Sequence, residues 1–166
     1  QRKQFKRNQK PYPRLSDHIG LLPLVMISPS DAELIRGGSD ERRRWMDMIL
    51  SQYDGLAMHA LIRYNKALQQ RNRMLREQST DTALYEVLEM QLAQHGQQIF
   101  DARTRLIEEF LPFFDEYYRA IGRDDEAVGL RYISQLQTVS LEEELARHRE
   151  APRCPLCSTP PSCAAN

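Results

Sequence analysis

The chain has 166 residues, and its 23 Lys and Arg balance its 23 Asp and Glu, so the formal net charge is zero. This length suits one domain with its own core, since such a domain buries roughly 70% of the surface that its unfolded form exposes. No apolar run approaches the roughly 18 residues that cross a bilayer, and basic residues stand where a signal peptide would be apolar. We expect a soluble, cytoplasmic protein that begins before Gln1.

The zero net charge hides a division between the two halves of the sequence. Residues 1–76 carry 15 Lys/Arg against 7 Asp/Glu, and residues 77–166 carry 8 against 16. A basic half attracts a phosphate backbone and an acidic half repels it, so any nucleic acid should meet the first half. The alternative is that two oppositely charged helices attract each other.

The first 27 residues favour extended chain. Residues 1–14 hold six basic residues and no acid, and two prolines prevent a helix, which predicts two short strands joined at residues 8–9. One helical turn follows and ends at Gly20. Leu22–Ile27 is an apolar run of strand length, which is typical of a strand buried on both faces.

Two helices are predicted next. Ser28-Pro29-Ser30-Asp31 opens a short helix, which the glycines at positions 37 and 38 end. A long helix begins at Ser39, a good N-cap, and has two acids in its first turn, where the helix dipole favours them. Asp54-Gly55 is the expected interruption, and beyond it apolar residues recur at spacings of four, three, four and seven as far as residue 75.

A second long helix is predicted after a polar turn at residues 78–81, because apolar positions step by threes and fours for about ten turns. These positions are Leu84, Leu88, Leu92, His95, Ile99, Ala102, Leu106, Phe110, Phe113, Tyr117 and Ile121. The two amphipathic helices indicate an antiparallel helical hairpin with coiled-coil-like packing. Pro112 should kink the second helix. Leu130–Leu136 alternates as a half-buried strand would, and residues 140–149 favour one more helix.

The predicted order is therefore strand, helical hairpin, strand, in a mainly α chain. Two short flanking β segments are not stable by themselves and need a larger sheet. The chain is too short to supply that sheet, so we expect it to come from residues outside the chain.

Several separated blocks of the sequence resemble the RecF family of bacterial DNA-repair ATPases in their residues and in their spacing. The blocks are Phe5–Tyr12, Ile19–Met26, Ser28–Asp31 with Ile35 and Gly37, Glu41–Arg44 with Asp47, Arg63–Leu68, and Gln70–Asn72. The resemblance as a whole covers about residues 2–145, and several blocks in a fixed order are more specific than one short motif.

RecF proteins are ABC-type ATPases with a P-loop head, and ATP closes two heads into a dimer on DNA. The resemblance implies that residues 1–38 are the rim of an incomplete head, residues 39–122 a helical arm, residues 123–150 the return to the head, and residues 151–166 an unstructured or non-native tail. It also implies ATP and Mg²⁺ as cofactors of the full-length protein, binding at single-strand gaps, and partnership with RecR and RecO in loading RecA.

The motifs of ATP hydrolysis do not occur in this sequence. A Gly-rich loop of the form G-x-x-x-x-G-K-[ST] wraps phosphates with backbone N–H groups. The 166 residues contain no such string, no ABC signature loop and no apolar strand that ends in paired acids. We expect this stretch alone neither to bind the nucleotide nor to hydrolyse it.

The basic start of the chain is the predicted DNA contact. Its residues are Arg2, Lys3, Lys6, Arg7, Lys10 and Arg14, interleaved with Phe5 and Tyr12. Such a segment could track a phosphate backbone. The alternative is a solvated edge ribbon whose lysines protect it from aggregation.

The second predicted site is the junction of head and arm, where related ATPases sense the nucleotide. It comprises Ser28, Pro29, Asp31, Arg42 and Arg43. Neighbours on a helix point about 100° apart, so the three arginines at positions 42–44 cannot all face one way. One or two of them should pair with carboxylates such as Asp31 or Asp47 and fix the arm to the head. The alternative is a DNA or nucleotide contact.

The cysteines Cys154, Cys157 and Cys163 all lie in the last 13 residues, which excludes a disulfide framework for the body of the fold. Cys154 and Cys157 have zinc-knuckle spacing, and Cys163 with His148 could complete four ligands. We favour no metal site, because the family has a different strand at this distance. A truncated or frame-shifted reading after about Glu150 accounts for the tail better.

Two rival classes remain open. One is a non-enzymatic helical-hairpin adaptor or dimerisation module, whose apolar stripes would bind a partner helix. The other is a small zinc protein that uses the tail cysteines.

Overall fold

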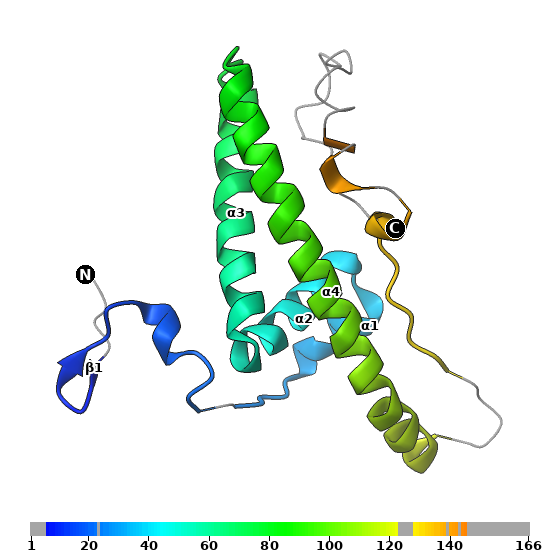
Figure 1. Cartoon of the computed structure of the whole chain (residues 1–166). Helices are drawn as coiled ribbons and strands as arrows, with labels where there is room; N and C mark the ends of the chain where they lie inside the picture. Colours follow the sequence, from blue (N-terminus) through cyan, green and yellow to red (C-terminus); the bar gives the residue numbers. More distant parts are fainter. Residues whose placement is uncertain (1–5, 23, 123–127, 139, 143, 146–166) are drawn as a thin grey trace.

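The structure is a computed structural model, and it describes residues 6–22, 24–122, 128–138, 140–142 and 144–145. Within these residues the chain is mostly helical, as predicted (Figure 1). In chain order the elements are β1 (Lys6–Arg7), β2 (Lys10–Pro11), a 3-10 helix (Leu15–His18), a second 3-10 helix (Pro29–Ala32), α1 (Glu33–Arg36), α2 (Ser39–Tyr53), α3 (Gly55–Arg76), α4 (Thr82–Ile121) and a third 3-10 helix (Gln135–Gln137).

The break between α2 and α3 is built by Asp54. Its backbone is extended, with φ −111° and ψ 95°, so α2 cannot continue through it. Its carboxylate accepts hydrogen bonds of 2.9 Å from the backbone N–H groups of Leu56 and Ala57, which satisfies two donors at the start of α3. One residue therefore ends α2 and begins α3, and the predicted interruption is confirmed. We call this bend the elbow.

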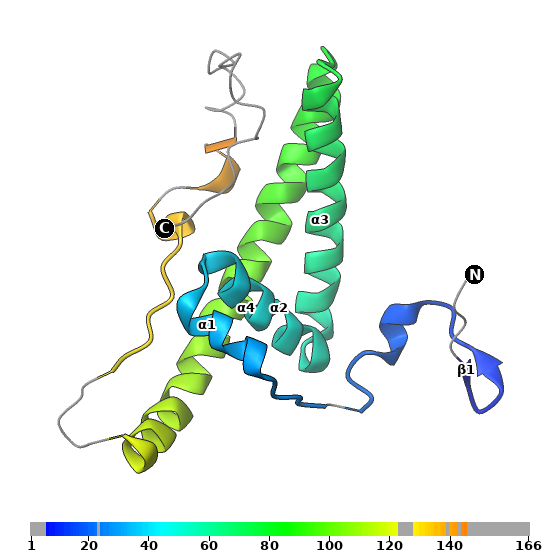
Figure 2. The same ribbon diagram turned by 180° about the vertical axis from the view of Figure 1, so that it is seen from behind.

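Helices α3 and α4 lie side by side and are joined by a turn at residues 77–81 (Figures 1 and 2). Gln78 adopts a positive φ of 54° in this turn. Asp81 then caps α4, because its carboxylate accepts a 3.0 Å hydrogen bond from the N–H of Leu84. We call α3 together with the part of α4 beside it the arm.

The core runs along the arm from its base to the turn. Three buried clusters form it: Met46, Leu50, Ala57, Ala102 and Leu106 at the base; Ala60, Leu61 and Ile99 in the middle; and Ala67, Met74, Tyr85, Leu88 and Leu92 toward the turn. The first cluster joins α2 to α3 and α4, and the other two join α3 to α4. The apolar stripe of α3 therefore packs against the stripe of α4 as far as Leu106.

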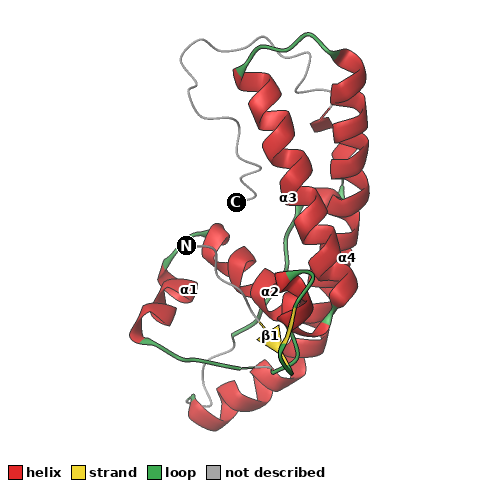
Figure 3. Cartoon of the chain, turned by 90° about the vertical axis from the view of Figure 1, so that its left-hand side faces the viewer, coloured by secondary structure: helices red, strands yellow, loops and turns green. Residues whose placement is uncertain are grey.

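Helices α1 and α2 lie at the base of the arm, and α4 extends beyond them (Figures 1 and 3). Helix α4 continues through Pro112. Its last turns carry the rings of Phe110, Phe114 and Tyr118, which contact one another in sequence at centroid distances of 6.1 and 5.9 Å. They line an apolar hollow of about 350 Å³.

The segment Leu22–Ile27 differs from the prediction. It is extended, but it pairs with no strand in the described part of the chain, and the five side chains of Leu22 and residues 24–27 are 76–87% exposed. A buried strand needs neighbours on both sides. None of the described residues provides such neighbours for this run.

The predicted strand at Leu130–Leu136 is also corrected. Residues 128–134 have no regular structure, and a 3-10 helix spans Gln135–Gln137. Tyr132 packs against Phe100 of α4 at a ring-centroid distance of 5.8 Å. Tyr132 is therefore half-buried against a helix rather than in a sheet, whereas Leu130 is exposed. Residues 141–142 and 144–145 are helical, where one more helix was predicted.

Among the described residues, no helix combines the length and the apolar composition that crossing a membrane requires.

Candidate nucleic-acid interface and head–arm junction

The predicted DNA contact forms a short β ribbon. Lys6 pairs with Pro11 and Arg7 with Lys10, and the tight turn between the strands has positive φ angles at both central residues. Lys6, Lys10 and Arg14 are exposed. Arg2 and Lys3 lie outside the described residues, as does the side chain of Arg7. We call residues 6–14 the ribbon.

Contacts with the following segment support the ribbon. The Tyr12 hydroxyl lies 3.2 Å from Nδ1 of His18, and the two rings meet edge to face at 5.3 Å. Gly20 then approaches the end of α2, because a Cβ there would lie 2.2 Å from the carbonyl oxygen of Gln52. Its φ of +85° also favours glycine. The ribbon is thus connected to the elbow through a position that excludes a side chain.

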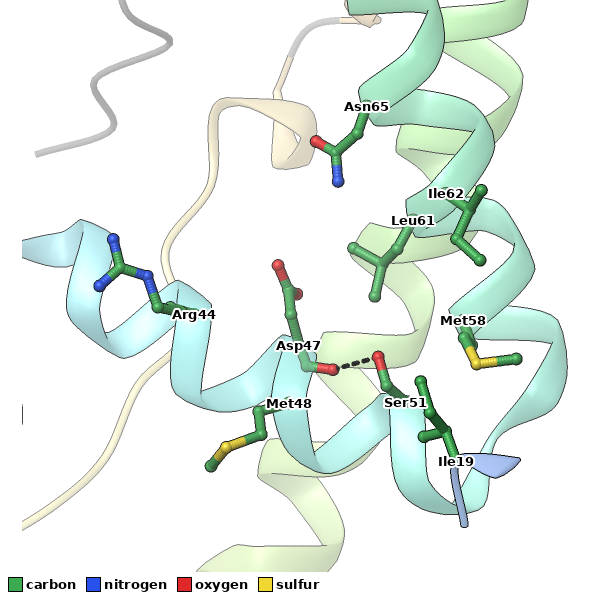
Figure 4. A pocket seen from close by; sticks show the side chains of 9 residues that line it. All are labelled: Ile19, Arg44, Asp47, Met48, Ser51, Met58, Leu61, Ile62 and Asn65. Carbon is green, nitrogen blue, oxygen red and sulfur yellow. Dashed lines mark hydrogen bonds between the residues drawn. The ribbon is translucent and has the colours of Figure 1, made fainter. Parts of the chain in front are cut away.

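The hollow at the elbow lies between α2 and α3 and has a volume of about 350 Å³. Its lining residues are Ile19, Arg44, Asp47, Met48, Ser51, Met58, Leu61, Ile62 and Asn65. Figure 4 shows Ile19 at one end and the polar side chains of Asp47 and Asn65 directed into it. The Ser51 hydroxyl donates a 2.6 Å hydrogen bond to the backbone carbonyl of Asp47, so its proton is already used within α2.

The Ser28–Asp31 turn behaves as a helix start. The Asp31 carboxylate accepts a 2.7 Å hydrogen bond from the Ser28 N–H, and the hydroxyls of Ser28 and Ser30 lie 2.7 Å apart. Pro29 occupies the first helical position, where its missing N–H costs nothing. These contacts are local, and none of them reaches α2.

The arginines at positions 42–44 have other partners than predicted. Arg42 donates to the carbonyl oxygens of Leu34 and Gly37 at 3.2 and 3.0 Å, so it ties α2 to the end of α1. Arg43 pairs with Asp40 and Arg44 with Glu41, each three residues earlier on the same helix. Two of the three arginines therefore pair with carboxylates, as expected, but the partners are Asp40 and Glu41, one turn away. The charge of Arg43 still acts on Asp47, where it favours the ionised carboxylate and so lowers its pKa.

Asp47 instead binds Arg103 of α4. Arg103 Nε and Nη2 donate hydrogen bonds of 2.9 Å to the two carboxylate oxygens, which makes a bidentate pair between α2 and α4. Burial raises the pKa of Asp47 above its ordinary 3.8, although Arg103 opposes this effect. A carboxyl group with a raised folded-state pKa contributes stability at low pH and loses it as the pH rises through that pKa. The pair connects α2 to α4 at the base of the arm.

The described residues hold no group of three or more His, Cys, Asp or Glu side chains that could bind a metal ion. Cys154, Cys157, Cys163 and His148, the alternative zinc ligands, lie outside these residues. Sequence reasoning placed the ribbon and the helix start. It missed the Asp47–Arg103 pair, whose members stand 56 residues apart, and the contact of Gly20 with α2.

These features define a class of protein: a helical arm with a basic ribbon near its base. There, hydrogen bonds connect α2 to α1 and to α4. No protein-family model matches the chain. The chain is 61% identical over 153 residues to the DNA replication and repair protein RecF of Parabacteroides distasonis, covering 92% of this chain and 42% of the relative. It is 54% identical over 150 residues to RecF of Bacteroides thetaiotaomicron, covering 90% and 41%.

Solved structures agree with these relatives. A structure of the recombination mediator protein RecF-ATPrS in the RecFOR pathway superposes with a TM-score of 0.71 at 25% identity, over 84% of this chain and 38% of that one. The RecF-ATP structure of the same pathway gives 0.72 at 23% identity, over 89% and 41%. The chain is thus similar to RecF proteins over about nine tenths of its own length, and it spans about two fifths of the length of the curated relatives it matches.

Proposed function

We propose that the chain supplies the arm and the junction of a RecF-like, ATP-dependent DNA-binding protein of recombinational repair and replication restart. The protein would act at single-strand gaps in the cytoplasm and help to load RecA, in partnership with RecR and RecO. The observation that carries the proposal is the 61% identity to a DNA replication and repair protein over 92% of the chain.

The proposal divides the chain into functional parts. Residues 1–38 are the rim of the ATPase head, residues 39–122 a coiled-coil-like antiparallel arm, residues 123–150 the return, and residues 151–166 a tail. ATP with Mg²⁺ binds to the head outside these residues, because no phosphate-wrapping glycine loop occurs in the sequence. Nucleotide binding would close two copies of the full-length protein into a dimer on DNA.

Two exposed apolar surfaces support the proposal that an ATPase head packs against this chain. Leu22 and residues 24–27 are 76–87% exposed, and at the end of α4 Phe113, Tyr117 and Ile121 are 59%, 66% and 86% exposed. Contiguous apolar surface of this kind marks an interface. The junction residues Ser28, Pro29, Asp31, Arg42 and Arg43 lie between the two surfaces in the sequence, where they could transmit a nucleotide-driven movement of the head to the arm.

The alternative function is a helical-hairpin adaptor or dimerisation module. An adaptor would need an apolar stripe left free for a partner helix. The buried clusters instead place the stripe of α3 against the stripe of α4 as far as Leu106, and the exposed Phe113, Tyr117 and Ile121 lie beyond it, at the end of α4. The packing therefore favours the ATPase arm.

The DNA-binding residues of the proposal are Arg2, Lys3, Lys6, Arg7, Lys10 and Arg14. We expect the variant K6Q/K10Q/R14Q, made in the protein expressed from its full reading frame, to bind DNA on the order of tenfold more weakly. Because each lost phosphate contact removes about 0.7–0.9 from the slope of log affinity against log salt, the slope should fall by about two to three. Fluorescence anisotropy with a gapped duplex at several salt concentrations measures both quantities.

The matched control is R36Q/R119Q/R131Q, which removes three exposed arginines outside the ribbon and should leave the slope unchanged. If the ribbon variant keeps the wild-type slope, the ribbon is a solvated edge and the DNA contact lies elsewhere.

A further inference from the structure

Helix α3 carries charges of one sign only, and all of them are positive. Its 22 residues include five Lys or Arg and no Asp or Glu. Helix α4, beside it, has seven Asp or Glu and three Arg in 40 residues. Part of the division of charge between the two halves of the sequence is therefore a division between the two helices of the arm.

Four of the five cations on α3 face away from α4. At about 100° per residue, positions 63, 66 and 73 fall within about 80° of one another, and position 76 is about 60° further round. All four side chains are exposed, whereas Arg71 is buried in the seam. We call Arg63, Lys66, Arg73 and Arg76 the α3 basic face.

The acids of α4 do not neutralise this face. Between α3 and α4, the ion pair described is that of the buried Arg71 with Glu89, at 3.1 Å. Arg73 pairs with Glu77 in the turn at 2.8 Å. In the part of the chain that the structure describes, Arg63, Lys66 and Arg76 form no ion pair. No close ion pair with α4 therefore occupies these three cations.

We propose that the α3 basic face binds the phosphate backbone of nucleic acid, as a second contact beyond the ribbon. The proposal rests on the proposed DNA-binding function. From Arg63 to Arg76 the helix rises about 20 Å, at 1.5 Å per residue. One strand of a duplex presents about six phosphates over that length. Gln70 lies on the same side of α3 and adds a neutral donor of the kind that also binds phosphates.

The arrangement of the molecule agrees with this contact. In Figures 1 and 2 the ribbon extends on the side of the arm where α3 lies, and the segment after α4 lies on the other side. A backbone bound at the ribbon could continue along α3, while the acids of α4 would repel it from the opposite side. The contact thus lengthens the binding site and also fixes which side of the arm meets the nucleic acid.

A nucleic acid suits the face better than a protein does. The centres of protein interfaces are enriched in aromatic residues and depleted in charge. The α3 basic face has no aromatic side chain, and apart from Ile62, which lines the hollow at the elbow, its exposed positions from 59 to 76 are polar or charged. Evenly spaced cations without an apolar centre are typical of backbone binding, which carries no sequence specificity.

The test is the variant R63Q/K66Q/R76Q in the protein expressed from its full reading frame, with R36Q/R119Q/R131Q as the control of equal charge. Glutamine is a good helix former, so the arm should keep its melting temperature. We expect the salt slope for a gapped duplex of about 30 base pairs to fall by about two to three, with on the order of tenfold weaker binding. The control should match the wild-type protein.

The ribbon variant separates this inference from the proposed function. If K6Q/K10Q/R14Q weakens binding while R63Q/K66Q/R76Q binds like the wild type, the inference is overturned and the proposed function stands. If the wild-type protein itself binds no DNA, both fail. If the α3 variant keeps its DNA affinity but loses binding to RecR or RecO, the face is a protein surface, and the inference is again overturned.

Discussion

The substitution Glu89→Leu is expected to lower the free energy of unfolding by about 3–5 kcal/mol. Glu89 is 3% exposed and Arg71 is 8% exposed, and Arg71 Nε donates a 3.1 Å hydrogen bond to a carboxylate oxygen of Glu89. Without the carboxylate, a guanidinium that cannot lose its proton stays buried with its charge uncompensated. Urea unfolding followed by circular dichroism measures the loss.

The double variant R71M/E89L is the control for this prediction. Methionine and leucine fill a similar volume and leave no buried charge, and such replacements of buried pairs are often neutral or stabilising. We therefore expect the double variant to recover most of the stability that the single variant loses. A single variant as stable as the wild type would show that Arg71 reaches solvent and that the seam is not dry at this position.

The second large effect is expected for Leu50→Ala, with a loss of about 2–5 kcal/mol. Leu50 is 1% exposed and packs in the cluster that joins α2 to α3 and α4 at the base of the arm. Truncation removes buried apolar atoms and leaves a cavity among neighbours that belong to three helices, which cannot collapse together. The melting temperature and the urea midpoint should both fall.

Leu56→Ala is the matched control for Leu50, because it makes the same change only six positions along the chain. Leu56 is 84% exposed, so its truncation should change stability by about 0.5 kcal/mol or less. Equal losses for both variants would mean that the base cluster does not hold the elbow together.

The helices of the arm could be predicted from sequence because their signals are local. The apolar periods of α3 and α4 extend over many turns, and Asp54 and Asp81 are capping residues with glycine or a polar turn beside them. These features lie within a few residues of the structure they determine. The order of the helices and the place of the elbow follow from them directly.

Features that depend on distant partners could not be predicted in the same way. The run Leu22–Ile27 has strand composition, but whether it is buried depends on a neighbouring strand and not on the run itself. Asp47 was expected to pair with the nearby arginines at positions 42–44, whereas its partner is Arg103 of α4. No period in the sequence indicates a pair of side chains that two helices bring together.

In the candidate site, too, features with local signals could be predicted and features that depend on distant residues could not. The ribbon turn and the Ser28–Asp31 helix start were predicted because positive-φ turns and N-caps have local sequence signals. The α3 basic face required the structure, because only the seam with α4 shows which cations remain exposed. Separating Arg71 from Arg63 and Lys66 by composition alone is impossible.

The central proposal is that this chain works inside a protein that binds DNA under the control of ATP. The most direct test measures the affinity of the protein expressed from its full reading frame for a gapped duplex, with and without ATP and Mg²⁺. Coupling between two sites typically changes affinity by roughly 5- to 150-fold, and we predict tighter binding within this range when ATP is present. The same affinity with and without the nucleotide would contradict the account.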